Sequence, residues 1–244
     1  FFVMGRVDGE VPPDIMPYNF GDSWLFAASS DQQRRLQEAS VDVLVRLHAI
    51  GDPQRHFAHV AGDLPGHTAL RRHMARTVAW YDWAARDCGR SQVVEKGLAW
   101  LEDHWPAHES DAVFCWGDSR IGNVMYRDFE PVAVLDWEMA GLAPPETDVA
   151  WMIYLHRMFE DMAAQYGFPG MPHFLQSDDV AGYYERRSGH APRDLQWYIV
   201  YAAVQFGIVG LRTGQRSVHF GERPAPADAD ELIMNAAAIT ALTA

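Results

Sequence analysis

Three short strand-like segments interrupt an otherwise helical chain near its middle. They cover 112–116, 124–127 and 132–135, and each is apolar or β-branched and bounded by turn residues. Helical periodicity dominates on both sides, and it predicts helices at about 30–50, 67–86 and 92–104, then at 146–166, 178–187, 193–212 and 228–242. Ser30 and Gln33 fit a capping box at the first of these helices. We therefore expect a predominantly helical α+β fold with a small central β insert.

The loops of this insert hold the densest polar cluster in the chain. Asp118 and Asn123 stand at the two ends of the loop between the first two segments, and Asp136 is the first polar residue after the third. Side chains at neighbouring strand ends can converge, and these offer the oxygen ligands that suit Mg²⁺ held together with phosphates. Phosphoryl transfer needs one carboxylate to orient the attacking hydroxyl, and an Asn and a second Asp to hold the metal. The spacing Asp-x-x-x-x-Asn followed by a strand that ends in Asp fits this logic.

The same segments carry a resemblance to a known family. W-G-D-S-R-I-G-N at 116–123 and V-L-D-W-E at 134–138 resemble the H-G-D-x-x-x-x-N and D-W-E or D-F-E motifs of aminoglycoside phosphotransferases and choline-kinase-like enzymes. L-H-A at 47–49 and D-V-A at 148–150 are similar to flanking motifs of that family. The opening F-F-V-M-G-R-V-D-G resembles the hinge strand whose backbone receives adenine. The resemblance covers essentially the whole chain, in order.

The resemblance implies a role for each matched residue. Those roles are catalytic base for Asp118, Mg²⁺ ligands for Asn123 and Asp136, outer metal partner for Glu138, structural support of the catalytic loop for Asp148, and backbone contacts to adenine near Gly5 and Val7.

The roles of three further side chains are less specific. Trp116 stands where the family usually has His, and because that His has a packing role we expect the change to be tolerated. Arg120 either contacts a phosphate or the substrate, or forms an ion pair that stabilises the loop. His48 is expected to be structural.

The resemblance also implies the domain organisation of a protein-kinase-like C-terminal lobe. Residues 1–10 would be the hinge strand and linker, and residues 11–244 the helical lobe that binds substrate and catalyses the reaction. No glycine-rich loop or strand lysine precedes this lobe, Lys96 lies on a predicted helix, and no G-x-x-x-x-G-K-[ST] motif occurs. We therefore expect the N-terminal β lobe to be missing, and these 244 residues alone to catalyse little.

The implied activity is ATP- and Mg²⁺-dependent transfer of a γ-phosphoryl group to a hydroxyl of a small molecule, an aminoglycoside or another alcohol. Two alternatives remain open at this stage. One is a non-catalytic, pseudokinase-like module that binds a ligand or partner, and the other is a metal-dependent hydrolase. The sequence selects neither the acceptor nor ATP over GTP, and it does not give the oligomeric state.

Charge and hydropathy narrow the partners. The chain has 33 acidic and 20 basic residues and a net charge of −13, which argues against nucleic-acid binding. This balance would suit a cationic substrate, or it serves solubility alone. Acidic residues of the later helices, such as Glu160 and Asp161, either line a pocket for an amine or form a solvated face. No signal peptide, membrane span or disulfide framework is evident, so the sequence predicts a soluble, cytoplasmic protein.

Overall fold

The computed structural model describes residues 5–15, 17–61 and 64–244. Helices dominate and strands are few and short, as expected. The elements in chain order are α1 (Ser30–His48), α2 (Pro53–His56), α3 (Ala58–Ala61), α4 (Ala69–Ala84), α5 (Gln92–Asp103), β1 (Val113–Cys115), the 3₁₀ turn η1 (Ile121–Asn123), β2 (Val124–Arg127), β3 (Glu130–Val134), β4 (Gly141–Ala143), α6 (Glu146–Gln165), α7 (Ser177–Ser188), α8 (Leu195–His219), the 3₁₀ turn η2 (Ala229–Leu232) and α9 (Ala236–Leu242).

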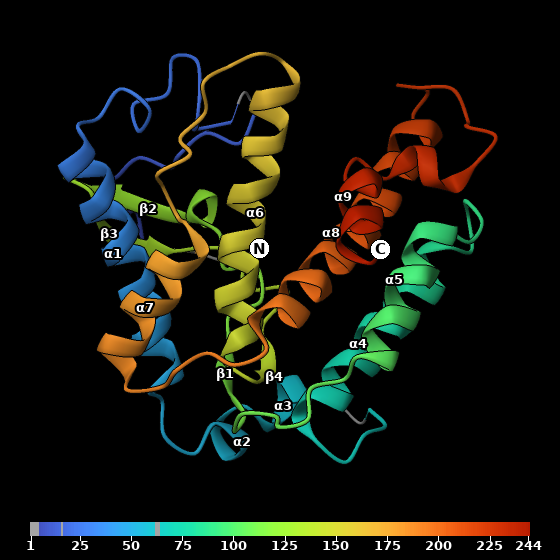
Figure 1. Cartoon of the computed structure of the whole chain (residues 1–244), viewed down its shortest axis with the longest axis horizontal. Coiled ribbons are helices and arrows are strands. Elements are labelled where there is room, and N and C mark those ends of the chain that lie inside the picture. The colour runs from blue at the N-terminus through green and yellow to red at the C-terminus, as the bar shows by residue number, and fades with distance from the viewer. Residues whose placement is uncertain (1–4, 16, 62–63) are drawn as a thin grey trace.

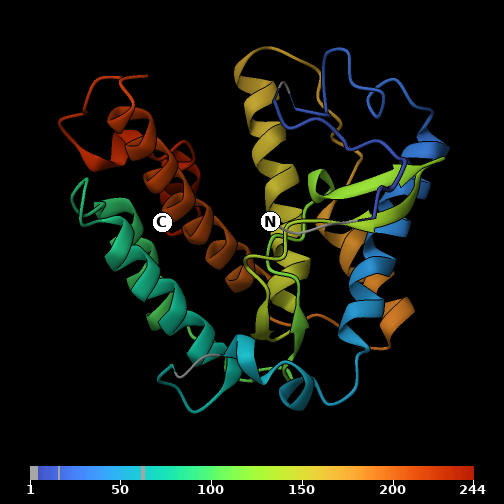
Figure 2. The same cartoon turned by 180° about the vertical axis from the view of Figure 1, so that it is seen from behind.

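Helix α6 is the centre of the arrangement. Strands β2 and β3 lie on one side of it with α1 and α7, and α4, α5, α8 and α9 lie on the other (Figure 1). Helices α6 and α8 pack against each other near their N-terminal ends and diverge toward their C-terminal ends, which both views show (Figures 1 and 2).

Helix α6 is central because most of its residues, and all of those in its first half, are buried. Every residue from Glu146 to His156 is buried, as are the residues of α8 from Trp197 to Gln205 that face the same core. At about 25 cal/mol per Å² of apolar surface removed from water, this pair supplies much of the driving force for folding. It also gives the polar loops that lie against α6 a rigid base.

The β insert consists of two antiparallel pairs. β1 pairs with β4, with Val113 opposite Ala143, and β2 pairs with β3, with Val124 opposite Val134. A two-residue turn at Asp128 and Phe129, both with positive φ, closes the β2–β3 hairpin. Because β2 and β3 lie between β1 and β4 in sequence, the β1–β2 loop and the β3–β4 loop are brought together.

The start of α1 differs from the sequence prediction by one residue. The N-cap is Ser29, whose hydroxyl accepts from the backbone N–H of Gln32 at 3.3 Å while the Gln32 side chain accepts from the Ser29 N–H at 2.9 Å. The predicted box of Ser30 and Gln33 is therefore wrong. Gln33 is buried and donates to the Leu25 carbonyl instead, so its amide holds the preceding loop against the helix.

The last predicted helix, 228–242, is also wrong, because the chain breaks between η2 and α9. At the break the buried Asn235 amide donates to the Ala203 carbonyl at 2.8 Å and to the Tyr154 hydroxyl at 2.7 Å. The backbone at Ile233 is extended, with φ −97° and ψ 104°, which interrupts the helix, and the Asn235 bonds hold the segment after the break against α6 and α8. Strand β4 and the short helices α2 and α3 were not predicted, and the predicted opening strand falls largely on residues 1–4, outside the described residues.

No helix in the described ranges combines the length and the hydropathy needed to cross a membrane.

Candidate active site

The loop after β1 presents Asp118 at a sharp backbone turn. Gly117 has φ +91°, and a Cβ built on it would lie 2.4 Å from the carbonyl oxygen of Met139. Only glycine satisfies both conditions, because a left-handed φ strains other residues and the β3–β4 loop leaves no room. This glycine therefore lets the two polar loops touch directly beside Asp118.

The carboxylate of Asp118 is held by three donors. Its Oδ1 accepts from the indole N–H of Trp151 at 2.7 Å, and its Oδ2 accepts from the Asn123 amide at 2.7 Å and from the Arg120 guanidinium at 3.1 Å. The side chain keeps 14% of its surface exposed. Because both carboxylate oxygens of Asp118 accept hydrogen bonds, the side chain has a fixed orientation. Its exposed edge faces the neighbouring cavity.

Arg120 bridges Asp118 to Asp14, which lies in the loop before α1. Its guanidinium pairs with both carboxylates. Burial lowers the pKa of Arg120, but Asp118 and Asp14 more than offset this and raise it above its ordinary value. Of the two readings left open for Arg120, the structure shows the ion pair. Asp14 carried no sequence signal, because it sits in a Pro- and Asp-rich loop distant in sequence from the catalytic loop.

Asp136 and Glu138 lie on the facing loop between β3 and β4. Asp136 adopts φ +56°, and both side chains are exposed and border the cavity that Asp118 faces. Within the described residues neither carboxylate has a hydrogen-bond or ion-pair partner. Asn123 is buried and lies behind Asp118, and its amide N–H₂ is used on Asp118, which leaves its carbonyl oxygen as a possible ligand. Two free carboxylates and a carboxamide oxygen form a donor set that fits Mg²⁺.

Trp116, at the start of the β1–β2 loop, connects this loop to the β3–β4 loop. Its indole N–H donates to the carbonyl oxygens of Leu135 at 2.9 Å and Asp136 at 3.0 Å. The ring itself is fully buried. Trp116 thus packs in the core and supports the loop that presents Asp136.

Asp148, near the start of α6, holds the beginning of the β1–β2 loop by hydrogen bonds. It is fully buried, and its carboxylate accepts from the backbone N–H groups of Trp116 at 2.7 Å and Gly117 at 2.8 Å. His48 donates to it at 3.1 Å, and the Tyr184 hydroxyl holds the other ring nitrogen of His48 at 2.8 Å. Both ring nitrogens of the buried His48 side chain are thus hydrogen-bonded inside the protein, and Asp148 connects α1, α6 and the β1–β2 loop.

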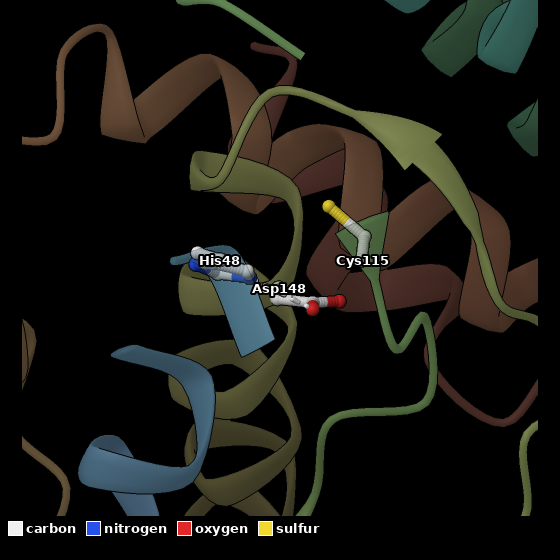
Figure 3. Close-up of side chains that lie close together, drawn as sticks. All are labelled: His48, Cys115 and Asp148. Carbon is white, nitrogen blue, oxygen red and sulfur yellow. Dashed lines mark hydrogen bonds and ion pairs between the residues drawn. The ribbon is translucent and has the colours of Figure 1, made fainter. Parts of the chain in front are cut away.

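His48, Asp148 and Cys115 lie close enough to suggest a metal site, since one ligand atom from each falls within 4.8 Å of the others (Figure 3). Their bonding argues against it. Both Asp148 oxygens already accept N–H groups, and burial raises the pKa of the Cys115 thiol well above its ordinary value, which disfavours the thiolate that a metal requires. We therefore interpret the cluster as a structural hydrogen-bond network and not as a metal site.

Gly5 and Val7 lie apart from this cavity. Both are exposed, and open space surrounds the Gly5 Cα. The segment that follows them is anchored, because Glu10 and Tyr126 exchange two backbone hydrogen bonds of 2.8 and 2.7 Å. The predicted adenine contacts of Gly5 and Val7 stay a prediction.

The cavity has a volume of about 370 Å³ and extends from the acidic loops into the space where α6 and α8 diverge. A second cavity of about 320 Å³ adjoins it and shares Glu138 and Met139 with it. Together they are of a size that accepts a small organic molecule.

Comparison with known proteins agrees with this geometry. The model of the phosphotransferase enzyme family matches residues 1–176. Ethanolamine kinase 2 of Mus musculus is 32% identical over 103 residues, which cover 40% of this chain and 27% of that protein. Acyl-CoA dehydrogenase family member 11 of Homo sapiens is 24% identical over 153 residues, which cover 62% of this chain and 18% of that protein. The matched part is thus about a quarter or less of these relatives.

Solved structures share the fold. A putative aminoglycoside phosphotransferase from Ralstonia eutropha superposes with a TM-score of 0.68 at 19% identity, covering 98% of this chain and 70% of that one. A ternary complex of aminoglycoside phosphotransferase APH(4)-Ia with AMP-PNP and hygromycin B gives 0.52 at 17% identity, covering 90% and 68%. A GDP complex of aminoglycoside 2′-phosphotransferase-IIIa gives 0.53 at 13%, covering 96% and 69%. With the family model matching well over half of its length, the chain belongs to the phosphotransferase enzyme family.

Proposed function

We propose that the protein transfers the γ-phosphoryl group of ATP to a hydroxyl group of a small molecule, with Mg²⁺. The observation that carries this proposal is the environment of Asp118. Its carboxylate is oriented by Trp151, Asn123 and Arg120 at the mouth of a cavity that Asp136 and Glu138 also border.

In the proposed reaction Asp118 accepts the proton of the acceptor hydroxyl as that oxygen attacks. A bond forms between the acceptor oxygen and the γ-phosphorus, the bond from the γ-phosphorus to the β,γ-bridging oxygen breaks, and ADP leaves with that electron pair. The three donors around Asp118 keep it from rotating away, which favours the near-attack geometry on which such reactions depend.

Asn123 and Asp136 would hold Mg²⁺, with Glu138 as an outer partner. When bound, the ion neutralises the charge of the phosphates. Asp136 is suited to this because its carboxylate is exposed and unengaged in the described structure. The positive φ of Asp136 turns the backbone directly after β3, so this side chain is presented at the edge of the sheet.

The backbone near Gly5 and Val7 would receive the adenine ring. Support for a nucleotide donor comes from related folds, since solved neighbours include complexes with AMP-PNP and with GDP. Those complexes contain both an adenine and a guanine nucleotide, so ATP is proposed on the resemblance of residues 1–9 to the adenine-binding hinge.

The proposal can be tested by ADP release across a panel of aminoglycosides, amino alcohols and simple alcohols. The protein used is the natural gene product that contains these residues. Asp118→Asn should lower acceptor-dependent ADP release by about 10²- to 10⁴-fold, because the base and its charge are lost. Asp128→Asn is the matched control, since Asp128 lies in the β2–β3 turn and Asn suits its φ of +50°. Equal rates for Asp118→Asn and the wild type would overturn the proposal.

A further inference from the structure

The walls of the Asp118 cavity are apolar beyond the acidic loops. Leu155, Met158 and Met162 line it from α6, and Phe206 and Val209 line it from α8. These residues belong to the diverging halves of the two helices (Figure 2). The part of the cavity farther from the β insert is therefore a hydrophobic groove that continues directly from Asp118.

Glycines of α8 place one more apolar side chain at the rim of the groove. A Cβ at Gly210 would lie 3.6 Å from Ile233 Cα and 3.7 Å from the backbone nitrogen of Met234, so the segment after η2 lies close on this face of α8. A Cβ at Gly214 would come within 2.9 Å of Leu232 Cβ. This close packing brings Met234 to the cavity, where it remains 67% exposed.

Charged groups lie only at the catalytic end of this cavity, within the described residues. They are Asp14, Asp118, Arg120, Asp136 and Glu138. The first three pair with one another, and the last two are the proposed metal partners. Within the described residues, none of the carboxylates that line this cavity belongs to α6 or α8.

The acidic residues that could have formed an amine pocket lie elsewhere. Glu160 accepts from the Asn19 amide at 2.8 Å and from the Met171 N–H at 2.7 Å, and it borders a different cavity. Asp161 is exposed and borders none of the cavities described here. Of the two readings that the sequence left open, a solvated or internally bonded face describes them better.

The adjoining cavity does not favour a cation either. Besides Glu138 its only charged lining residue within the described chain is Arg76, whose guanidinium donates to the carbonyls of Met139 at 2.9 Å and Ala140 at 3.0 Å. Thr77 and Gln205 supply neutral polar groups. Among the described lining residues, a polycationic molecule spanning both cavities would meet carboxylates only at the end that Glu138 shares, a positive charge at Arg76 in one cavity, and hydrocarbon along α6 and α8 in the other.

We infer that the acceptor is an alcohol with an apolar body, whose hydroxyl lies at Asp118 and whose hydrocarbon lies between α6 and α8. This rests on the proposed phosphotransferase function. Methionines form much of the wall, and their flexible thioethers adapt to hydrocarbons of differing shape. The groove thus selects against acceptors that would bring a charged amine onto the walls of α6 and α8.

The test compares matched acceptors that differ only in a terminal amine. Phosphoryl transfer from ATP is measured with 1-butanol, 1-hexanol and 1-octanol, and with 6-amino-1-hexanol and the aminoglycoside kanamycin. Because burying one methylene is worth a factor of about four, kcat/KM should rise about fourfold per added methylene. The amine should lower kcat/KM by at least about tenfold relative to 1-hexanol, since its ammonium would lose water without gaining a partner.

Two phenylalanines, Phe206 in α8 and Phe220 at the C-cap of that helix, provide the matched variants. Phe206→Ala should remove much of the gain with chain length, whereas Phe220→Ala, at the exposed end of the helix and outside the groove, should preserve it. Thermal melting of both variants separates loss of the groove from loss of the fold. If Phe206→Ala is unfolded, Phe206→Leu is used, and a weaker dependence on chain length is then expected.

The outcomes separate this inference from the proposed function. Phosphoryl transfer to kanamycin or to 6-amino-1-hexanol, with none to 1-butanol, 1-hexanol or 1-octanol, would support the proposed phosphotransferase function. The same result would overturn the inference that the acceptor has an apolar body. If no compound accepts phosphate, the proposed function fails for this panel. Calorimetry that compares the binding of 1-octanol and of 8-amino-1-octanol then still tests whether the groove prefers an apolar ligand. Preferred binding of 1-octanol would support it, and equal or reversed binding would overturn it.

Discussion

Replacing Asp148 with Asn should destabilise the protein severely although the two side chains have nearly the same shape. The Asp148 carboxylate is fully buried and accepts three N–H groups, from Trp116, Gly117 and His48. Asn keeps one acceptor oxygen, and its best orientation places that oxygen toward Trp116 and His48. Its NH₂ group then faces the N–H of Gly117, which leaves a buried donor without an acceptor.

The magnitude follows from these bonds. A hydrogen bond to a charged group is worth about 1.5–3 kcal/mol and one to a neutral group about 0.5–1.5 kcal/mol, and an unsatisfied buried donor costs about 1–3 kcal/mol. Two weakened bonds and one orphaned N–H give a loss of about 4 kcal/mol in the free energy of unfolding. Because the affected backbone directly precedes Asp118, kcat should also fall.

Urea denaturation of Asp148→Asn and of Asp161→Asn measures this effect. Asp161 lies on the same helix but is exposed, so its substitution should change the free energy of unfolding by less than about 0.5 kcal/mol. If both variants unfold at the same urea concentration as the wild type, the hydrogen bonds of Asp148 do not stabilise the β1–β2 loop.

Three further predictions follow from single contacts. Trp151→Phe removes the donor to Asp118 Oδ1 and should lower kcat about tenfold in the phosphotransfer assay, with a modestly lower melting temperature because the smaller ring leaves buried space unfilled. Gly117→Ala places a Cβ against the Met139 carbonyl at a left-handed φ and should abolish activity and lower the melting temperature, whereas no change in either would refute the close approach. Burial lowers the pKa of His156 from 6.5 to about 4, so the unfolded chain binds a proton that the folded chain refuses between these values. Stability should therefore fall on acidification through that window, by about 1.4 kcal/mol per pH unit for this group, and His156→Gln should weaken the pH dependence of the melting temperature.

The parts that could be predicted from sequence are those encoded locally. The strands around Asp118 and Asn123 followed from short apolar runs between turn residues, and α6 followed from helical periodicity over 146–166. The spacing of Asp118, Asn123 and Asp136 indicated their chemistry, and the structure places Asp118 and Asp136 on one cavity with Asn123 bonded to Asp118.

What the sequence could not give depends on contacts between distant segments. Trp151 reaches Asp118 across 33 residues, and Asp14 reaches Arg120 across 106. Neither pairing leaves a periodic pattern, since each needs only one suitable side chain at the right place in the fold. The break before α9 has the same origin, because the Asn235 amide bonds to α6 and α8 rather than to its own helix.

The most direct test of the central claim follows the label of γ-labelled ATP in the natural gene product with Mg²⁺ and an alcohol acceptor. We expect the label to appear covalently on the acceptor, and Asp118→Asn to lower this transfer by about 10²-fold or more while Asp128→Asn does not. Label found only in inorganic phosphate, at a rate independent of the acceptor, would rule out phosphotransfer and identify a hydrolase instead.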